Sequence, residues 1–248
     1  MQPIDVRNPR TGEVDYQLQA PPPDALARRC EELRVAQAEW SALPAAERIG
    51  VMLRWAESID RHADKISKAL AADTGRWRMS VESPQNVANG VRGWCEMAGA
   101  LLEPASGQSQ LMPDASFVTY PRPYPLLAVI SPWNVPFLLA TIDATPALMA
   151  GCAAIIKPSE VTPRFIEPVQ ESIDSVPELA RVLQFVGGAA ETGQQMIAEA
   201  DVVVFTGSVA TGQRILRAAS ERFIPCFLEL GGKDAAIVTE CADLERAA

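Results

Sequence analysis

From Leu126 onward, short apolar runs alternate with segments of helical pattern, and this alternation constrains the fold more than any other feature of the sequence. Short continuous apolar runs are typical of strands that are covered on both faces, as in a parallel sheet. The sequence therefore predicts an α/β fold with a mostly parallel βαβ sheet. The expected strands are 126–130, 153–156, 182–186, 201–205 and 225–230, with 235–238 as a candidate further strand, and the expected helices are 135–149, 163–175, 192–200 and 208–220.

The residues before this sheet predict a helical lead. Pro44 begins a stretch in which apolar residues recur at helical spacing until Gly75. Further helices are expected over 25–40 and 84–100, whereas the first twenty residues are a polar lead with a turn signal at Asn8–Gly12. We therefore expect three parts within one domain of residues 1–248: a helical lead over 1–105, a ribbon over 106–124 and the sheet over 125–248.

The ribbon is indicated by a change in composition. Pro, Gly, Ser and Gln dominate from Glu103 to Pro113, which indicates a loop or linker. The strand-like residues 117–120 follow, and three prolines come directly after them. Because proline cannot donate to a central ladder, this segment is expected at an edge.

Composition excludes several classes of function. The chain has 22 basic and 31 acidic residues, a net charge of −9, and no Lys/Arg run that could neutralise phosphates, so a nucleic-acid partner is not expected. The apolar stretch 135–156 contains Asp143 and two prolines, which favours a buried helix and strand over a membrane span. Five scattered cysteines and one histidine indicate neither disulfides nor a metal site and fit a cytoplasmic setting without a signal peptide.

Two polar motifs follow the first two strands of the expected sheet, at the edge where ligands of such sheets bind. In Ser131-Pro132-Trp133-Asn134, the amide of Asn134 could donate a hydrogen bond to an oxyanion, or it could simply cap the next helix. In Lys157-Pro158-Ser159-Glu160, the ammonium and the carboxylate could hold vicinal hydroxyls, or they could form a solvated turn.

Two further motifs lie at the same edge. Phe205-Thr206-Gly207-Ser208 leads into a helix whose first N–H groups suit a pyrophosphate, although a plain tight turn is the alternative. It matches neither the G-x-G-x-x-G fingerprint nor a Walker A loop. Glu229-Leu230-Gly231-Gly232-Lys233 places a carboxylate at the end of an apolar strand, where desolvation raises a pKa toward general-base work, unless Glu229 merely pairs with Lys233.

The four motifs occur in this order, each at the end of an expected strand, and together they resemble the aldehyde dehydrogenase superfamily. The resemblance covers the chain from near its N-terminus to its last residue. It implies a Rossmann-like cofactor-binding domain and oxidation of a small-molecule aldehyde to an acid with NAD or NADP, through a cysteine thiohemiacetal. By resemblance, Asn134 is the oxyanion-hole amide and Glu229 the general base. The implied cofactor-binding residues are Ser131, Pro132, Trp133, Lys157, Ser159, Glu160, Phe205, Thr206, Gly207, Ser208, Leu230 and Gly231, with no metal.

Within that set, the resemblance places the adenosine ribose on Lys157 and Glu160, and the pyrophosphate on Ser208. The Glu160 carboxylate would repel a 2′-phosphate, so NAD is favoured over NADP. The ribbon is similar to the family's bridging ribbon, which pairs subunits, and a homo-oligomer of the full-length form is expected.

The sequence departs from the family in its cysteines. The family's nucleophile lies a few dozen residues beyond the Glu-Leu-Gly-Gly-Lys motif, whereas Cys241 is too close and has acidic neighbours that disfavour a thiolate. We therefore expect the cofactor-binding half of an aldehyde dehydrogenase, truncated before its nucleophile and inactive alone. The alternative is an inactive NAD-binding remnant or a partner subunit in a mixed oligomer. The cysteines that do not fit are Cys30, Cys95, Cys152, Cys226 and Cys241.

Overall fold

The computed structural model describes residues 3–247 and is built around a five-stranded parallel sheet. The strand order is β7-β6-β5-β8-β9, and each neighbouring pair is parallel. The predicted α/β fold is therefore confirmed. The strands are β5 (Leu126–Ile130), β6 (Ala153–Lys157), β7 (Leu183–Phe185), β8 (Val202–Thr206) and β9 (Cys226–Glu229).

The strand order reverses once, and this reversal decides which helices cover which face. The chain proceeds outward from β5 through β6 to β7, returns to β8 on the other side of β5, and then reaches β9. Right-handed crossovers place the helices of the first half on one face and those of the second half on the other. The first set is α4 (Pro136–Thr141), α5 (Ala144–Ala150), α6 (Ile166–Asp174) and α7 (Pro177–Ala180), and the second is α8 (Ala190–Glu199) and α9 (Val209–Glu221).

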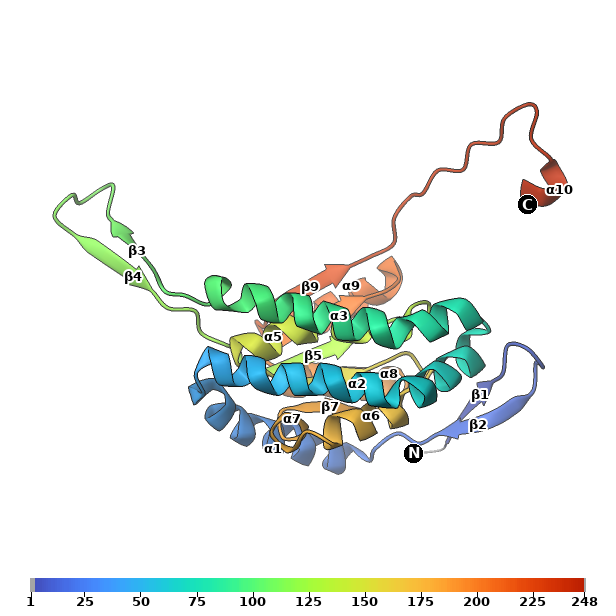
Figure 1. Cartoon of the computed structure of the whole chain (residues 1–248), viewed down its shortest axis with the longest axis horizontal. Coiled ribbons are helices and arrows are strands. Elements are labelled where there is room, and N and C mark those ends of the chain that lie inside the picture. Colours follow the sequence, from blue (N-terminus) through green and yellow to red (C-terminus); the bar gives the residue numbers. More distant parts are fainter. Residues whose placement is uncertain (1–2, 248) are drawn as a thin grey trace.

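Three long helices from the N-terminal part pack around this sheet (Figure 1): α1 (Pro23–Ala42), α2 (Ala45–Thr74) and α3 (Trp77–Leu101). Helix α2 packs against α6, and α3 packs against α4 and α5, while α1 lies against α8 and β6. The buried face of α2 carries Met52, Ile59 and Ile66 at helical spacing. The helix ends at Gly75, whose φ of +67° gives the left-handed cap that glycine adopts without strain.

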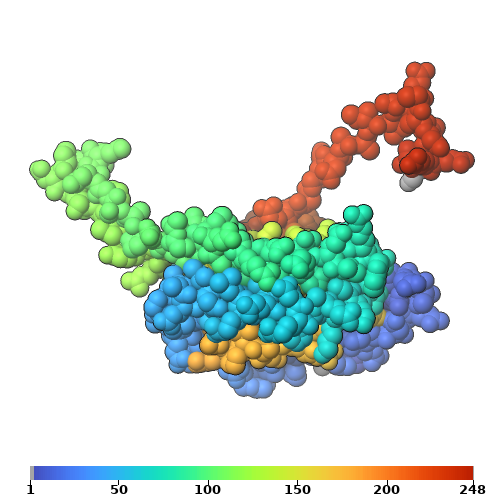
Figure 2. Space-filling model, viewed as in Figure 1, coloured from blue at the N-terminus to red at the C-terminus, as the bar shows by residue number. Residues whose placement is uncertain are grey.

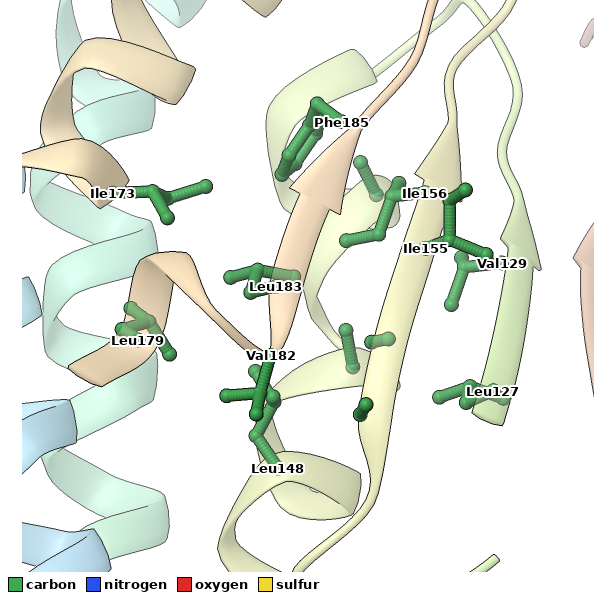
Figure 3. Close-up of a cluster of buried hydrophobic side chains, with 14 of the residues drawn as sticks. Leu127, Val129, Leu148, Ile155, Ile156, Ile173, Leu179, Val182, Leu183 and Phe185 are labelled. Carbon is green, nitrogen blue, oxygen red and sulfur yellow. The ribbon is translucent and has the colours of Figure 1, made fainter. Parts of the chain in front are cut away.

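One part of the core lies between the sheet and the first set of helices (Figure 3). Leu127, Ile156 and Leu183 from three adjacent strands face Ile173 and other apolar side chains of the helices. All five residues of β5 and of β6 are buried, as expected for strands covered on both faces. Each large apolar side chain buried in this way contributes about 1.5–3 kcal/mol.

Two antiparallel hairpins stand outside the sheet. β1 (Ile4–Arg7) pairs with β2 (Val14–Leu18), and β3 (Ala105–Gln108) pairs with β4 (Ser116–Thr119). Figure 2 shows the β3–β4 ribbon, in green, and the C-terminal segment, in red, projecting away from the layered body. The ribbon was predicted, although β3 falls in the stretch that we expected to be a loop.

Other boundaries differ from the prediction. The polar lead forms β1 and β2 around the turn that the sequence did indicate. The helix expected over 135–149 is divided at Ile142-Asp143, and α3 begins at Trp77 with Pro84 inside it. Residues 235–238 form no strand; the chain there is exposed, and α10 (Leu244–Ala247) follows. None of the helices within residues 3–247 combines the length and the apolar character that crossing a bilayer requires.

Candidate functional site

A cavity of about 720 Å³ opens at the carboxyl edge of the sheet. It lies between the neighbouring strands β5 and β8, whose following connections run to opposite faces of the sheet. Ligands of doubly wound parallel sheets bind at this position. Ten of the twelve cofactor-binding candidates line it. They are Ser131, Pro132, Trp133, Lys157, Ser159, Glu160, Phe205, Thr206, Gly207 and Ser208.

Helices α8 and α9 form the two long walls of the cavity, and these walls were not predicted as part of the site. On α9 the lining residues follow a helical face from Ser208 through Thr211, Arg214 and Ala218 to Arg222. On α8 they are small or apolar except for Gln194, which leaves a largely apolar slot between the helices. The α8 residues are Ala190, Gly193, Gln194, Ile197 and Ala198. Their helical spacing after Gly187-Gly188 is the signal that could have indicated them.

Ser131 contributes a buried hydroxyl that has no partner. It follows β5 directly, its backbone N–H donates to Lys157 O at 3.2 Å, and the residue is 4% exposed. Its Oγ is buried and makes no hydrogen bond within the described chain, and the residue itself lines the cavity. An unsatisfied buried hydroxyl costs about 1–3 kcal/mol, which a polar ligand group would recover.

Lys157 places a cation at the floor of the cavity. Its side chain is 5% exposed, and its Nζ donates to Gly188 O at 2.9 Å and to Pro158 O at 3.0 Å. The Glu160 carboxylate lies 3.4 Å from the same nitrogen. Burial lowers the pKa of Lys157, while the neighbouring Glu160 acts in the opposite direction. The two side chains that the sequence singled out are therefore adjacent, with Lys157 buried and Glu160 at the solvent side.

The turn from β8 to α9 brings backbone to the cavity surface. Ser208 is the N-cap of α9, and its Oγ accepts a hydrogen bond from Thr211 N at 3.3 Å. Gly207 lies against Phe205, and a Cβ at Gly207 would be 2.5 Å from Phe205 Cζ. A side chain at this position would displace the Phe205 ring, whereas glycine lets the chain turn tightly and leaves the start of α9 open to an anion.

The two catalytic candidates lie at the same edge but outside the cavity lining. Asn134 is exposed beside the small pocket formed with α2 and α3, and its carbonyl accepts from Arg76 Nη1 at 3.3 Å. Its side chain caps no helix, so the capping alternative is wrong. Glu229 ends β9 with its side chain exposed, so the desolvation expected from the sequence is wrong, because β9 is the outermost strand of the sheet. Its carbonyl accepts from Gly207 N at 3.0 Å. Burial and the charge of Glu229 raise the pKa of Asp143.

Leu230 and Gly231 do not line the cavity. Leu230 lies over Gly212 of α9, where a Cβ would be 2.6 Å from Leu230 Cδ2. Gly231 is exposed in the segment that leaves the sheet.

A buried ion pair fixes the loop that follows β6, and no sequence pattern indicated it. Asp73, at the end of α2, accepts from Arg164 N at 2.7 Å and from the Arg164 guanidinium, which also contacts Asp15. The Asp73 side chain is fully buried, and desolvation raises its pKa to about 6 although Arg164 acts in the opposite direction. Arg164 thereby ties α2 and the β1–β2 hairpin to the loop that carries Glu160.

Four of the five thiols have a raised pKa. Burial raises the pKa of Cys30 and of Cys95 to about 11, and it raises the pKa of Cys152 and Cys226 as well. These thiols are therefore not activated nucleophiles. Within residues 3–247, no group of three or more His, Cys, Asp or Glu side chains is arranged to hold a metal ion.

The residues around the cavity fit a dinucleotide. A buried ammonium and a carboxylate suit ribose hydroxyls, the open start of α9 suits a pyrophosphate, and the apolar slot suits a flat ring. The Ser131 hydroxyl, which has no partner within the described chain, could hydrogen-bond a polar group of such a ligand. A doubly wound parallel sheet with such a cavity at its switch point is the architecture of dinucleotide-binding α/β domains.

The chain belongs to the aldehyde dehydrogenase family, whose sequence model matches residues 1–248. N-succinylglutamate 5-semialdehyde dehydrogenase 1 of Caulobacter vibrioides is 35% identical over 98% of this chain and 52% of its own length. The solved structure of PutA from Anabaena variabilis matches with a TM-score of 0.91 and 45% identity, over 99% of this chain and 52% of that one.

A third match carries a nucleotide. The structure of a betaine aldehyde dehydrogenase variant from Staphylococcus aureus, in complex with NAD⁺, has a TM-score of 0.85 and 28% identity over 99% of this chain and 51% of that one. The chain thus spans about half the length of the curated relatives it matches.

Proposed function

We propose that this chain binds the nicotinamide dinucleotide of an aldehyde-oxidising dehydrogenase. The observation that carries the proposal is the cavity at the switch point, in which Lys157, Glu160 and the start of α9 converge. Lys157 and Glu160 bind the adenosine ribose through its hydroxyls, and Ser208 with the first N–H groups of α9 binds the pyrophosphate. When bound, the nicotinamide supplies the acceptor for a hydride.

The catalytic candidates suit the remaining steps of aldehyde oxidation. The Asn134 side-chain amide donates a hydrogen bond to the oxygen that becomes negatively charged when the aldehyde is attacked; removing one such donor typically costs about 2.7–4 kcal/mol of transition-state stabilisation. The Glu229 carboxylate, exposed at the end of β9, accepts a proton from water. The reaction also needs a thiolate, and four of the chain's thiols have raised pKa values, so we propose that these 248 residues alone do not turn over aldehyde.

Titration calorimetry of the purified chain with NAD tests the proposal. We expect saturable binding of one nucleotide per chain, and at least tenfold weaker binding by Lys157→Met. The matched control is Lys233→Met, which removes an exposed lysine outside the cavity and leaves the affinity unchanged. Thermal unfolding of each variant confirms that it is folded. Absence of binding at millimolar NAD and NADP would falsify the proposal.

We further propose that the Glu160 carboxylate favours NAD over NADP. Its side chain is 43% exposed beside Lys157, where it faces the ribose-binding end of the cavity and repels a 2′-phosphate. Glu160→Gln should raise the affinity for NADP relative to NAD. An unchanged ratio of the two dissociation constants contradicts this role.

A second proposal concerns the β3–β4 ribbon, which we infer joins copies of the chain. The ribbon projects from the body with Phe117 and Val118 about half exposed, and a two-stranded ribbon has edges open to further strands. Sedimentation velocity should show a dimer or larger species, which Val118→Asp shifts toward monomer. Val35→Asp, which adds the same charge at an exposed valine of α1, is the control. A wild-type chain that sediments as a monomer rules the proposal out.

A further inference from the structure

Arg214 is a cation in the cavity wall that the proposed function does not yet use. It lies on the cavity face of α9, two turns beyond the Ser208 N-cap. At 1.5 Å per residue, the separation of six positions corresponds to about 9 Å along the helix. A group bound at the start of α9 therefore does not occupy the position next to Arg214.

The surroundings of Arg214 suit a flat apolar ring. Ile215 and Ala218 are its neighbours on α9, and Ile197 and Ala198 of α8 line the same cavity. The carboxylates of Glu160 and Glu221 line the same cavity, so the wall does not favour an additional phosphate.

The Arg214 guanidinium is free to contact a ligand. The arginines that form ion pairs in the described chain are Arg34, Arg54, Arg78, Arg92, Arg164 and Arg181. Arg222, the other arginine of the cavity, is already engaged, because its Nη1 donates to Ile197 O at 2.8 Å and to Ala200 O at 3.4 Å at the end of α8. Arg214 is exposed and has no such partner within residues 3–247.

We propose that Arg214 stacks its guanidinium plane on the adenine ring of the bound dinucleotide. The inference rests on the proposed function: with the pyrophosphate at Ser208 and the ribose at Lys157 and Glu160, the slot between α8 and α9 is left for the base. A planar guanidinium stacks on aromatic faces and on bases, whereas the compact ammonium of lysine does not provide such a plane. Arg214 is thus a binding residue for the adenine and recognises NAD and NADP alike.

The test compares Arg214→Gln, Arg214→Lys and Arg217→Gln by calorimetric titration with NAD and with NADP. Arg217 is the matched control, because it is an exposed arginine of the same helix outside the cavity. We expect Arg214→Gln to weaken both nucleotides equally, by about 5- to 30-fold, which corresponds to about 1–2 kcal/mol for a cation–π contact. Arg214→Lys should remain weakened, and Arg217→Gln should bind as the wild type does.

Three results would overturn the assignment while leaving the proposed function intact. These are wild-type affinity in Arg214→Gln, a loss confined to NADP, and full rescue by Arg214→Lys; the last two would indicate a phosphate contact instead. A wild-type chain that binds neither nucleotide would refute the proposed function itself, and this inference with it. Circular dichroism of each variant establishes that the exposed substitutions leave the fold unchanged.

Discussion

The two edges of the central sheet are made by the same five strands, but they differ in whether their polar groups have hydrogen-bond partners within the chain. At the amino edge, side chains of α1 and α2 bind the backbone at the end of α5, directly before β6. Gln37 Nε2 donates to Gly151 O, Trp40 Nε1 to Leu148 O and Arg48 Nε to Met149 O, all at 2.8–2.9 Å. At the carboxyl edge, Ser131 keeps a buried hydroxyl without a partner and a cavity remains open.

This difference separates stability from binding within one sheet. The amino edge is closed by the chain's own groups, so its side chains stabilise the fold and leave nothing for a ligand. The carboxyl edge retains unsatisfied or solvent-facing groups, which lower stability and are available for binding. Substitutions at the two edges should therefore have opposite signatures.

The largest effect should come from the amino edge. Trp40 is 2% exposed and donates its indole N–H to Leu148 O, so Trp40→Ala should lower the free energy of unfolding by about 3–5 kcal/mol. Trp133, 51% exposed in the cavity wall, is the control, and Trp133→Ala should change stability by less than about 1 kcal/mol. Urea unfolding measures both. Equal losses at the two tryptophans would break the contrast between the edges.

A smaller, pH-dependent effect is expected from Asp73, the exception at the carboxyl edge. Its pKa is raised from 3.8 to about 6, so the folded chain holds a proton there that the unfolded chain has lost between these values. Protonated Asp73 therefore adds about 3 kcal/mol to the free energy of unfolding below about pH 4. This contribution is lost as the pH rises through about 6. The check is urea unfolding of wild type and Asp73→Asn from pH 4 to 7. Parallel curves for the two would show that Asp73 does not titrate in this range.

The smallest effect should be a gain in stability. Ser131→Ala removes the unpartnered hydroxyl and should stabilise the free chain by about 1 kcal/mol while weakening its binding of NAD. Ser172→Ala is the contrasting control, because that buried hydroxyl donates to Val169 O at 2.6 Å and its removal should destabilise the chain. A loss of stability in Ser131→Ala would show that its Oγ has a partner in solution.

The sequence predicted the loops of the site but not its walls. Each polar motif directly follows an apolar run, so Lys157 and Ser208 could be placed at one edge from the strand pattern alone. Ala190, Gly193 and Ile197 resemble ordinary residues of a packed helix, and only the crossover of α8 to the other face turns them toward the cavity.

The sequence also did not predict ion pairs between distant residues or strands with a weak apolar pattern. Asp73 and Arg164 are 91 positions apart, and nothing near either residue indicates the partner. The β1–β2 hairpin was missed because its short strands are largely exposed and carry little apolar pattern. Helical periodicity, in contrast, predicted most of α2, because buried residues recur on one face of it from Arg48 to Asp73.

The last strand of the sheet has a consequence for handling the protein. β9 pairs with β8 on one side and ends the sheet on the other, and Phe227 at its centre is 59% exposed, whereas the opposite edge strand β7 is short and has buried Leu183 and Phe185. An open, apolar strand edge is a template for the same edge of another molecule. The shelf life of a purified sample should therefore depend on its concentration, and a dilute stock should outlast a concentrated one.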